Sequence, residues 1–148
     1  MFSRVLQATW SDIDFNAHMR NTAYLDKAAD VRLIFFEESG LSMADFERLR
    51  VGPVALRDEI DYLKEIRLHE EVTVSLELAG LSEDKARFRL RNVFTRGDGN
   101  VSAVITTLCG WLDLNIRRLV PPPEGFLDVL LRLTRTEDYA VIPSIPKE

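Results

Sequence analysis

With 148 residues, 46% of them hydrophobic and 29% charged, the chain has the composition of a globular protein that is large enough to bury a core. Its net charge of −5 repels nucleic acids and anionic membranes at long range, so we expect neither as a main partner. It has one cysteine, no signal-peptide pattern and no window of 18 uninterrupted apolar residues. We therefore predict one cytoplasmic domain over residues 1–148.

The first part of the chain predicts a strand followed by a long helix. Residues 2–10 alternate loosely between apolar and polar side chains, as a strand does. From residue 22 to 38, apolar side chains recur at steps of three and four, which is the period of an amphipathic helix. Either Asn21 or Thr22 fits as its N-cap, and Lys27 falls on the predicted polar side.

A second, short helix follows at once. Gly40 stands where a left-handed residue commonly ends a helix. Ser42 and Asp45 have the spacing of a capping box, which predicts a helix to about residue 49.

From residue 51 the apolar period changes to two. The pattern predicts strands over residues 52–66, 72–78, 86–94 and 101–114, the first of them long enough to be bulged. GLSEDK and RGDGN fit tight hairpin turns. Prolines at 121–123 end the sheet, residues 124–133 are typical of a short helix, and the tail at 134–148 is expected to dock loosely or fray. This order predicts an α+β fold, in which an antiparallel sheet packs on one long helix and its free edges favour dimerisation.

Residues 10–18, WSDIDFNAH, place two acids, an asparagine and a histidine just before the long helix. Asp12, Asp14 and Asn16 match the first three ligands of an EF-hand loop, but alanines replace the glycine and the glutamate that such a loop needs. Asp12, Asp14 and His18 could supply three ligands to another metal, although their types and spacing are not diagnostic. We therefore predict no metal site.

Two catalytic interpretations remain for the polar residues. Cys109 lies in the apolar sequence VITTLCGWLDL, where a buried cysteine usually packs as a small hydrophobe. A carboxylate in a loop before a helix is more informative, because N–H groups at a helix N-terminus can stabilise an oxyanion while the carboxylate activates water or attacks a carbonyl. The stretch fits hydrolysis of an acyl group, and it also fits solvated loop acids beside a helix cap.

The spacing of these residues resembles that of a known family. Asp14-x-x-x-His18-x-x-Asn21-x-x-Tyr24-Leu25, followed by Ala29-x-x-Arg32 and Gly-Leu, resembles the hot-dog-fold acyl-CoA thioesterases, and most of all the 4-hydroxybenzoyl-CoA thioesterase-like group. The resemblance covers roughly residues 4–126 and includes IRLHEEVTVSLEL and LDLNIRRLVPPPEGF. It implies a five- or six-stranded antiparallel sheet wrapped around the long helix. It also implies active sites at the interface of a homodimer, with a tetramer as the alternative assembly.

The resemblance also implies roles for individual residues. Asp14 corresponds to the family's nucleophile or general base, and Asp12 is interpreted as a supporting acid, although the two roles could be exchanged. His18 corresponds to a histidine that organises the loop. Tyr24 corresponds to an aromatic residue on the first helical turn, which could equally pack in the core. The residues expected to contact substrate are His18, Arg20, Asn21, Thr22 and Tyr24.

One residue departs from the family pattern. Relatives commonly read His-Val-Asn-Asn, whereas this chain reads His-Met-Arg-Asn at residues 18–21. The cation of Arg20 is expected close to Asp14, where it would favour the charged carboxylate or occlude it in an ion pair.

The resemblance implies a thioesterase that acts on an acyl-CoA or acyl-carrier-protein thioester. Coenzyme A is expected only as part of the substrate, and no separate cofactor is predicted. Two alternatives stay open: a hot-dog hydratase or dehydratase, with His18 as the candidate histidine, and a non-catalytic acyl-CoA-binding protein. Arginine pairs well with phosphate, but the charged strand positions would also suit a solvated face; these positions are Lys85, Arg87, Arg89, Arg91, Arg117 and Arg118.

Overall fold

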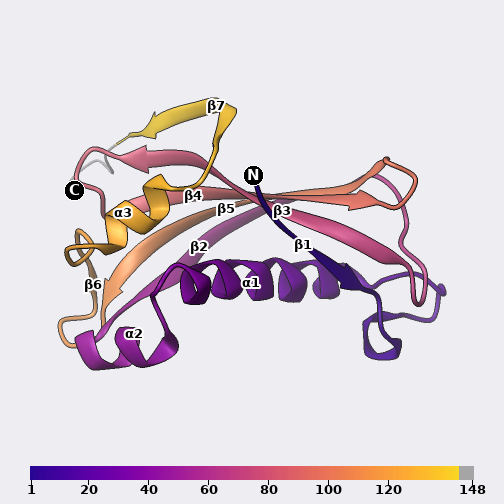
Figure 1. Cartoon of the computed structure of the whole chain (residues 1–148), viewed down its shortest axis with the longest axis horizontal. Helices are drawn as coiled ribbons and strands as arrows, with labels where there is room; N and C mark the ends of the chain where they lie inside the picture. The colour runs from indigo at the N-terminus through magenta and orange to yellow at the C-terminus, as the bar shows by residue number, and fades with distance from the viewer. Residues whose placement is uncertain (144–148) are drawn as a thin grey trace.

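The computed structural model describes residues 1–143, in which a curved sheet wraps over one long helix (Figure 1). In chain order the elements are β1 (Phe2–Gln7), the 3-10 helix η1 (Trp10–Asp12), α1 (Asn21–Glu38), α2 (Met43–Leu49), β2 (Val51–Tyr62), β3 (Glu71–Ser82), β4 (Arg87–Arg96), β5 (Val101–Asp113), β6 (Arg118–Leu119), α3 (Phe126–Leu131) and β7 (Arg135–Ile142). None of the helices in this part of the chain is long and apolar enough to cross a membrane.

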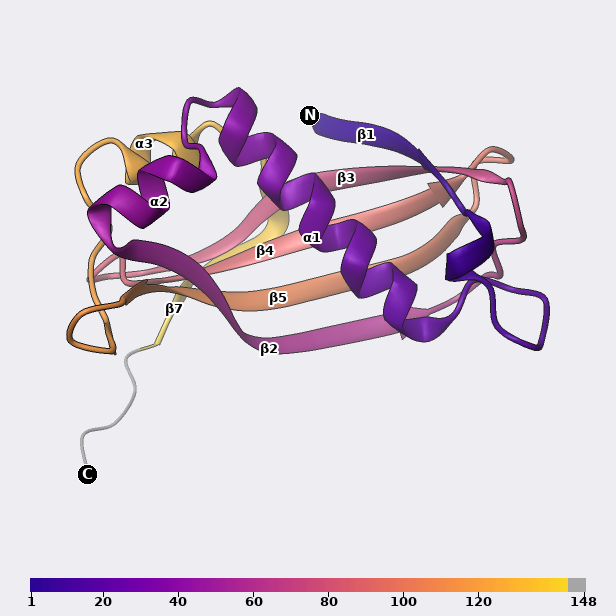
Figure 2. The ribbon, with the colours of Figure 1, turned by 90° about the horizontal axis from the view of Figure 1, so that it is seen from below.

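Five strands form the body of the sheet in the order β1-β3-β4-β5-β2, and all four of these pairings are antiparallel. The short strands β6 and β7 pair with β5 and β3. The register of β2 against β5 shifts between Ala55 and Arg57, which confirms the predicted bulge. Figure 2 shows α1 lying obliquely across one face of the sheet. This is the arrangement that the family resemblance implied.

Small and aromatic side chains hold α1 against the sheet. Ala23 and Ala28 are fully buried, and so small a side chain allows the helix to approach the strands closely. Farther along, Phe36 contacts the ring of Trp111 on β5 with 6.1 Å between ring centroids, and Trp111 in turn contacts Phe126 of α3 at 5.4 Å. These aromatic contacts place the C-terminal half of α1 in the core.

The helix ends follow the predicted pattern with one exception. Gly40 has a φ of 94°, and the Ser42 side chain accepts the N–H of Asp45 while the carboxylate of Asp45 returns to the Ser42 N–H, so the capping box is confirmed. The N-cap of α1, however, is Arg20, and the predicted choice of Asn21 or Thr22 is wrong. Asn21 is already the first residue of the helix, so the residue before it, Arg20, occupies the N-cap position.

The C-terminal tail is more ordered than its sequence suggested. Residues 135–142 form β7, which runs parallel to β3, so the expectation of a loosely docked tail is wrong for this segment. Asp138 accepts two hydrogen bonds from Arg91 at 2.7 and 3.0 Å, and Ile142 is buried. The last residues of β3 are mostly apolar on both faces of the sheet, and β7 pairs with the strand there. The last five predicted tail residues, 144–148, lie outside the described part of the chain.

The packing of β7 depends on a glycine in β3. A Cβ atom at Gly80 would lie 2.8 Å from the carbonyl oxygen of Ala140 in β7, whereas a Cβ at Gly52 in β2 would meet nothing within 4 Å. We expect Gly80→Ala to displace β7 and to lower the free energy of unfolding by about 1–3 kcal/mol, the usual cost of overpacking. Urea unfolding measures this cost, with Gly52→Ala as the matched control. Equal stability of the two variants would contradict the docking of β7.

Candidate functional site

The residues between β1 and α1 form a compact loop. β1 ends at Gln7, and Thr9 is the N-cap of η1. The N–H and the hydroxyl of Thr9 both donate to the Asp12 carboxylate, at 2.8 and 2.9 Å. Beyond η1, the N–H of Asp14 donates to the carbonyl of His18 at 3.0 Å. Asp14 and His18 therefore stand opposite each other at the base of a tight loop.

The Asp14 carboxylate takes part in the turn that closes this loop. Its Oδ1 atom accepts the N–H of Asn16 at 2.9 Å, which is an Asx turn. Ala17 adopts a left-handed conformation with a φ of 64°, and this allows the chain to reverse. Asp14 is only partly buried, so its side chain is not closed off from solvent.

A buried ion pair anchors the loop to the helix. The Lys27 ammonium lies 2.9 Å from Asp12 Oδ2 and donates to the Gln7 carbonyl at 3.2 Å, with both charged side chains only 11% and 12% exposed. Burial alone would raise the pKa of Asp12, but hydrogen bonds from Thr9 and Lys27 outweigh it and hold the pKa below its ordinary value. Asp12 is therefore ionised at neutral pH. The sequence placed Lys27 on the polar side of the helix, and that prediction is wrong.

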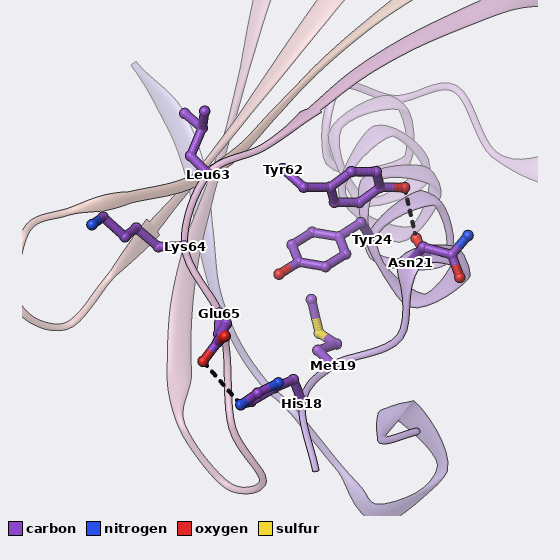
Figure 3. A pocket seen from close by; sticks show the side chains of 8 residues that line it. All are labelled: His18, Met19, Asn21, Tyr24, Tyr62, Leu63, Lys64 and Glu65. Carbon is purple, nitrogen blue, oxygen red and sulfur yellow. Dashed lines mark hydrogen bonds and ion pairs between the residues drawn. The ribbon is translucent and has the colours of Figure 1, made fainter. Parts of the chain in front are cut away.

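A cavity of about 250 Å³ opens beside the first turn of α1 (Figure 3). The rings of Tyr24 and Tyr62 meet edge to face there, 5.4 Å apart, and the Tyr62 hydroxyl donates to the carbonyl of Asn21 at 3.3 Å. The cavity lies where the start of α1 faces the segment that follows β2. Its lining residues are His18, Met19, Asn21, Tyr24, Tyr62, Leu63, Lys64 and Glu65.

Tyr24 both lines this cavity and packs in the core. Its hydroxyl lies 3.2 Å from the Ser102 hydroxyl, which in turn donates to the carbonyl of Lys64 at 2.7 Å. Burial raises the pKa of Tyr24, so its hydroxyl stays protonated. The tyrosine can therefore donate a hydrogen bond but is not a base.

The cavity also contains an acid that the sequence did not indicate. The Nε2 atom of His18 lies 2.9 Å from Glu65 Oε2, with the two side chains 30% and 60% exposed. Figure 3 shows this pair on the side of the cavity away from Tyr62. Glu65 is one of several acids in the sequence DEIDYLKEIRL, so no local signal distinguished it.

The other residues expected at the site do not line this cavity; they are Asp12, Asp14, Arg20 and Thr22. The guanidinium of Arg20 is paired with Asp26 at 3.5 Å and donates to the Thr22 hydroxyl and to the Ser11 carbonyl. The expected pairing of Arg20 with Asp14 is not among the ion pairs of residues 1–143. The cation is therefore held along the side of α1 and does not occlude the Asp14 carboxylate.

Two chemical possibilities raised by the sequence gain no structural support. Within residues 1–143, no group of three or more His, Cys, Asp or Glu side chains is placed to hold a metal ion. Cys109 is buried in β5, and burial raises the pKa of its thiol to about 12. The thiol is thus protonated at neutral pH and is a poor nucleophile.

The loop and the cavity can be compared with those of known proteins. A family model of the thioesterase-like superfamily matches residues 8–130. The chain belongs to this superfamily. Among curated protein sequences, none matches the chain significantly. The match confirms the family resemblance that the spacing of Asp14 and His18 suggested.

Solved structures show the same fold. A Staphylococcus aureus protein in complex with CoA is 26% identical, with a TM-score of 0.82 over 98% of this chain and 95% of that chain. A 1,4-dihydroxy-2-naphthoyl-CoA thioesterase from Synechocystis is 14% identical, with a TM-score of 0.80 over 88% of this chain and 95% of that chain. The predicted hot-dog fold is thereby confirmed.

The buried pair of Asp12 and Lys27 should be strongly coupled. Asp12→Asn or Lys27→Met alone leaves the partner charge buried, so we expect each to lower the free energy of unfolding by about 2–3 kcal/mol. The double variant leaves no buried charge and should cost clearly less than the sum of the two. Urea unfolding of the four proteins measures this coupling. Strictly additive costs would show that the pair does not anchor the loop.

Proposed function

We propose that the chain is a thioesterase that hydrolyses an acyl-CoA or acyl-carrier-protein thioester to a free acid and a thiol. The observation that carries the proposal is the position of Asp14, a partly exposed carboxylate at the base of the loop, opposite His18, which lines the cavity beside the start of α1. Membership of the thioesterase-like superfamily supports it. So does the likeness to the Staphylococcus aureus protein in complex with CoA.

The start of α1 supplies a place for an oxyanion. Its N-cap residue, Arg20, makes no side-chain capping bond. The N–H of Ala23 donates to the Arg20 carbonyl at 3.0 Å, so the N–H groups of Asn21 and Thr22 are the ones left to bind a negatively charged oxygen. The partial positive charge of the helix N-terminus adds to this stabilisation. We place the thioester carbonyl here, with the acyl or pantetheine portion against Tyr24 and Tyr62.

Asp14 then carries out the chemistry in one of two ways. As a general base it takes a proton from water, and the hydroxide adds to the carbonyl carbon. As a nucleophile it attacks that carbon itself, and water later hydrolyses the resulting anhydride. In both routes the C–S bond breaks and the thiolate leaves and takes up a proton. Asp12, tied to Lys27, supports the loop and has no direct part in either route.

We also infer that two copies associate through β2. Within the described residues, β2 pairs with β5 on one side only, and so it leaves an edge that a second copy could extend. Leu56 and Tyr62 of β2 are exposed, as are Leu63 just after the strand and Leu33 of α1. A dimer would cover them and bring the second copy close to the cavity.

Acyl-CoA substrates and a lone reduced cysteine suit the cytoplasm, which we propose as the location.

The assembly has a direct test. Sedimentation should give twice the chain mass of 16.9 kDa. Leu56→Lys, at the bulge of the free edge, should shift the protein toward the single-chain mass. A wild-type protein that sediments as a single chain at micromolar concentration would contradict the dimer.

The role of Asp14 is tested by a neutral replacement of the same shape. Asp14→Asn should keep the fold and the stability but lower kcat for acyl-CoA hydrolysis by at least about 100-fold, because the base or nucleophile is lost. Asp30→Asn, an exposed carboxylate on α1, is the matched control and should retain activity. Release of free thiol measures both. A folded Asp14→Asn protein with full turnover would rule out this mechanism.

A further inference from the structure

The pair of His18 and Glu65 stands on two backbone segments that are tied together. The N–H of Met19 donates to the carbonyl of Ile66 at 2.7 Å, so the residue after His18 is bonded to the residue after Glu65. The carbonyl of Glu65 accepts Arg96 Nη1 at 3.1 Å. The two side chains therefore meet because both backbones are held in register, and not only because two flexible side chains happen to touch.

The next segment along is fixed in the same way. The carbonyl of Ser102 accepts the N–H groups of Leu63 and Lys64 at 2.8 and 3.0 Å, and the Ser102 hydroxyl donates back to the carbonyl of Lys64. Glu65 thus follows a short segment that β5 holds at three points. A carboxylate on such a support can orient a neighbouring imidazole.

The stability of the fold does not explain this pair. Glu65 is 60% exposed, and ion pairs at such exposed positions contribute little to the free energy of folding. The pair nevertheless forms part of the wall of the cavity beside α1, together with Asn21 and Tyr24. Its location therefore points to a role toward a bound molecule.

We propose that His18 donates a proton to the departing thiolate and that Glu65 is its positioning residue. This inference rests on the proposed thioesterase function. The contact of His18 Nε2 with Glu65 Oε2 at 2.9 Å holds the ring in place and leaves Nδ1 to carry the proton that is transferred.

The proton balance is complete. Asp14 takes a proton from the attacking water, the tetrahedral oxyanion collapses, and the C–S bond breaks with its electron pair on sulfur. His18 then gives its proton to that sulfur, which yields a neutral thiol. Solvent carries the proton from Asp14 back to the imidazole. Asp14 and His18 would thus serve the two halves of one reaction from opposite sides of the same loop.

Changing the leaving group distinguishes proton donation by His18 from a purely structural role of the pair. An alkyl thiol such as that of CoA is a weak acid, with a pKa of about 8.5 when it resembles that of cysteine, and it needs protonation as it leaves. An aryl thiol leaves readily as its anion. We compare kcat for an acyl-CoA with kcat for the thiophenyl ester of the same acid, using wild type, His18→Gln, Glu65→Gln, Glu65→Ala and the His18→Gln/Glu65→Ala double variant.

For the acyl-CoA, we expect His18→Gln and Glu65→Ala each to lower kcat by roughly 10–100-fold. The kcat of Glu65→Gln should lie between that of wild type and that of Glu65→Ala. The double variant should be no slower than His18→Gln, because Glu65 acts through His18. For the thiophenyl ester, kcat should change by less than about threefold in every variant. Glu83→Gln, an exposed acid in the β3–β4 turn, is the control for loss of a surface charge.

Each other result overturns the inference. Equal losses on both esters would mean that the pair only maintains the cavity, and an unchanged kcat in Glu65→Ala would mean that Glu65 has no role. If wild type hydrolyses neither ester, the proposed hydrolysis of acyl-CoA is wrong and this inference falls with it. If wild type and the Glu65 variants hydrolyse both esters alike while Asp14→Asn does not, the thioesterase function stands and only this inference fails.

Discussion

The contact between Lys27 and Asp12 fixes the loop that carries the proposed catalytic residues. A lysine on α1 reaches a carboxylate in the preceding loop, and both charges are removed from water. Such a pair tolerates little displacement, because either charge without the other would be costly. The loop is thereby fixed on the helix, and this also limits where Asp14 and His18, which lie farther along the same loop, can be.

The sheet supplies the other wall of the site. The long β2 strand carries the chain to Tyr62 and on to Glu65, while Ser102 at the start of β5 holds this segment by backbone bonds. The cavity forms where the loop, the first turn of α1 and this segment meet. None of these elements forms a site alone, so the fold contributes chiefly by bringing three short segments into one place (Figure 3).

The sequence indicated the elements because their signals are local. Alternating apolar residues predicted the main strands, Ser42 and Asp45 predicted a helix start, and the spacing of Asp14 and His18 pointed to the loop. The missed features are pairings between distant segments. The ion pair of Lys27 breaks the ordinary rule that a lysine faces solvent, and the partner of His18 comes from beyond the next strand. The parallel pairing of β7 with β3 likewise leaves no pattern within either segment.

The most direct test of this account is the release of free thiol by the wild-type protein from short, medium, long and aromatic acyl-CoAs. A site with a carboxylate beside an uncapped helix N-terminus predicts saturable release from at least one of them, with one equivalent of free acid for each thiol. Binding of these acyl-CoAs without any release of thiol would contradict the account and would identify the protein as an acyl-CoA-binding member of its superfamily.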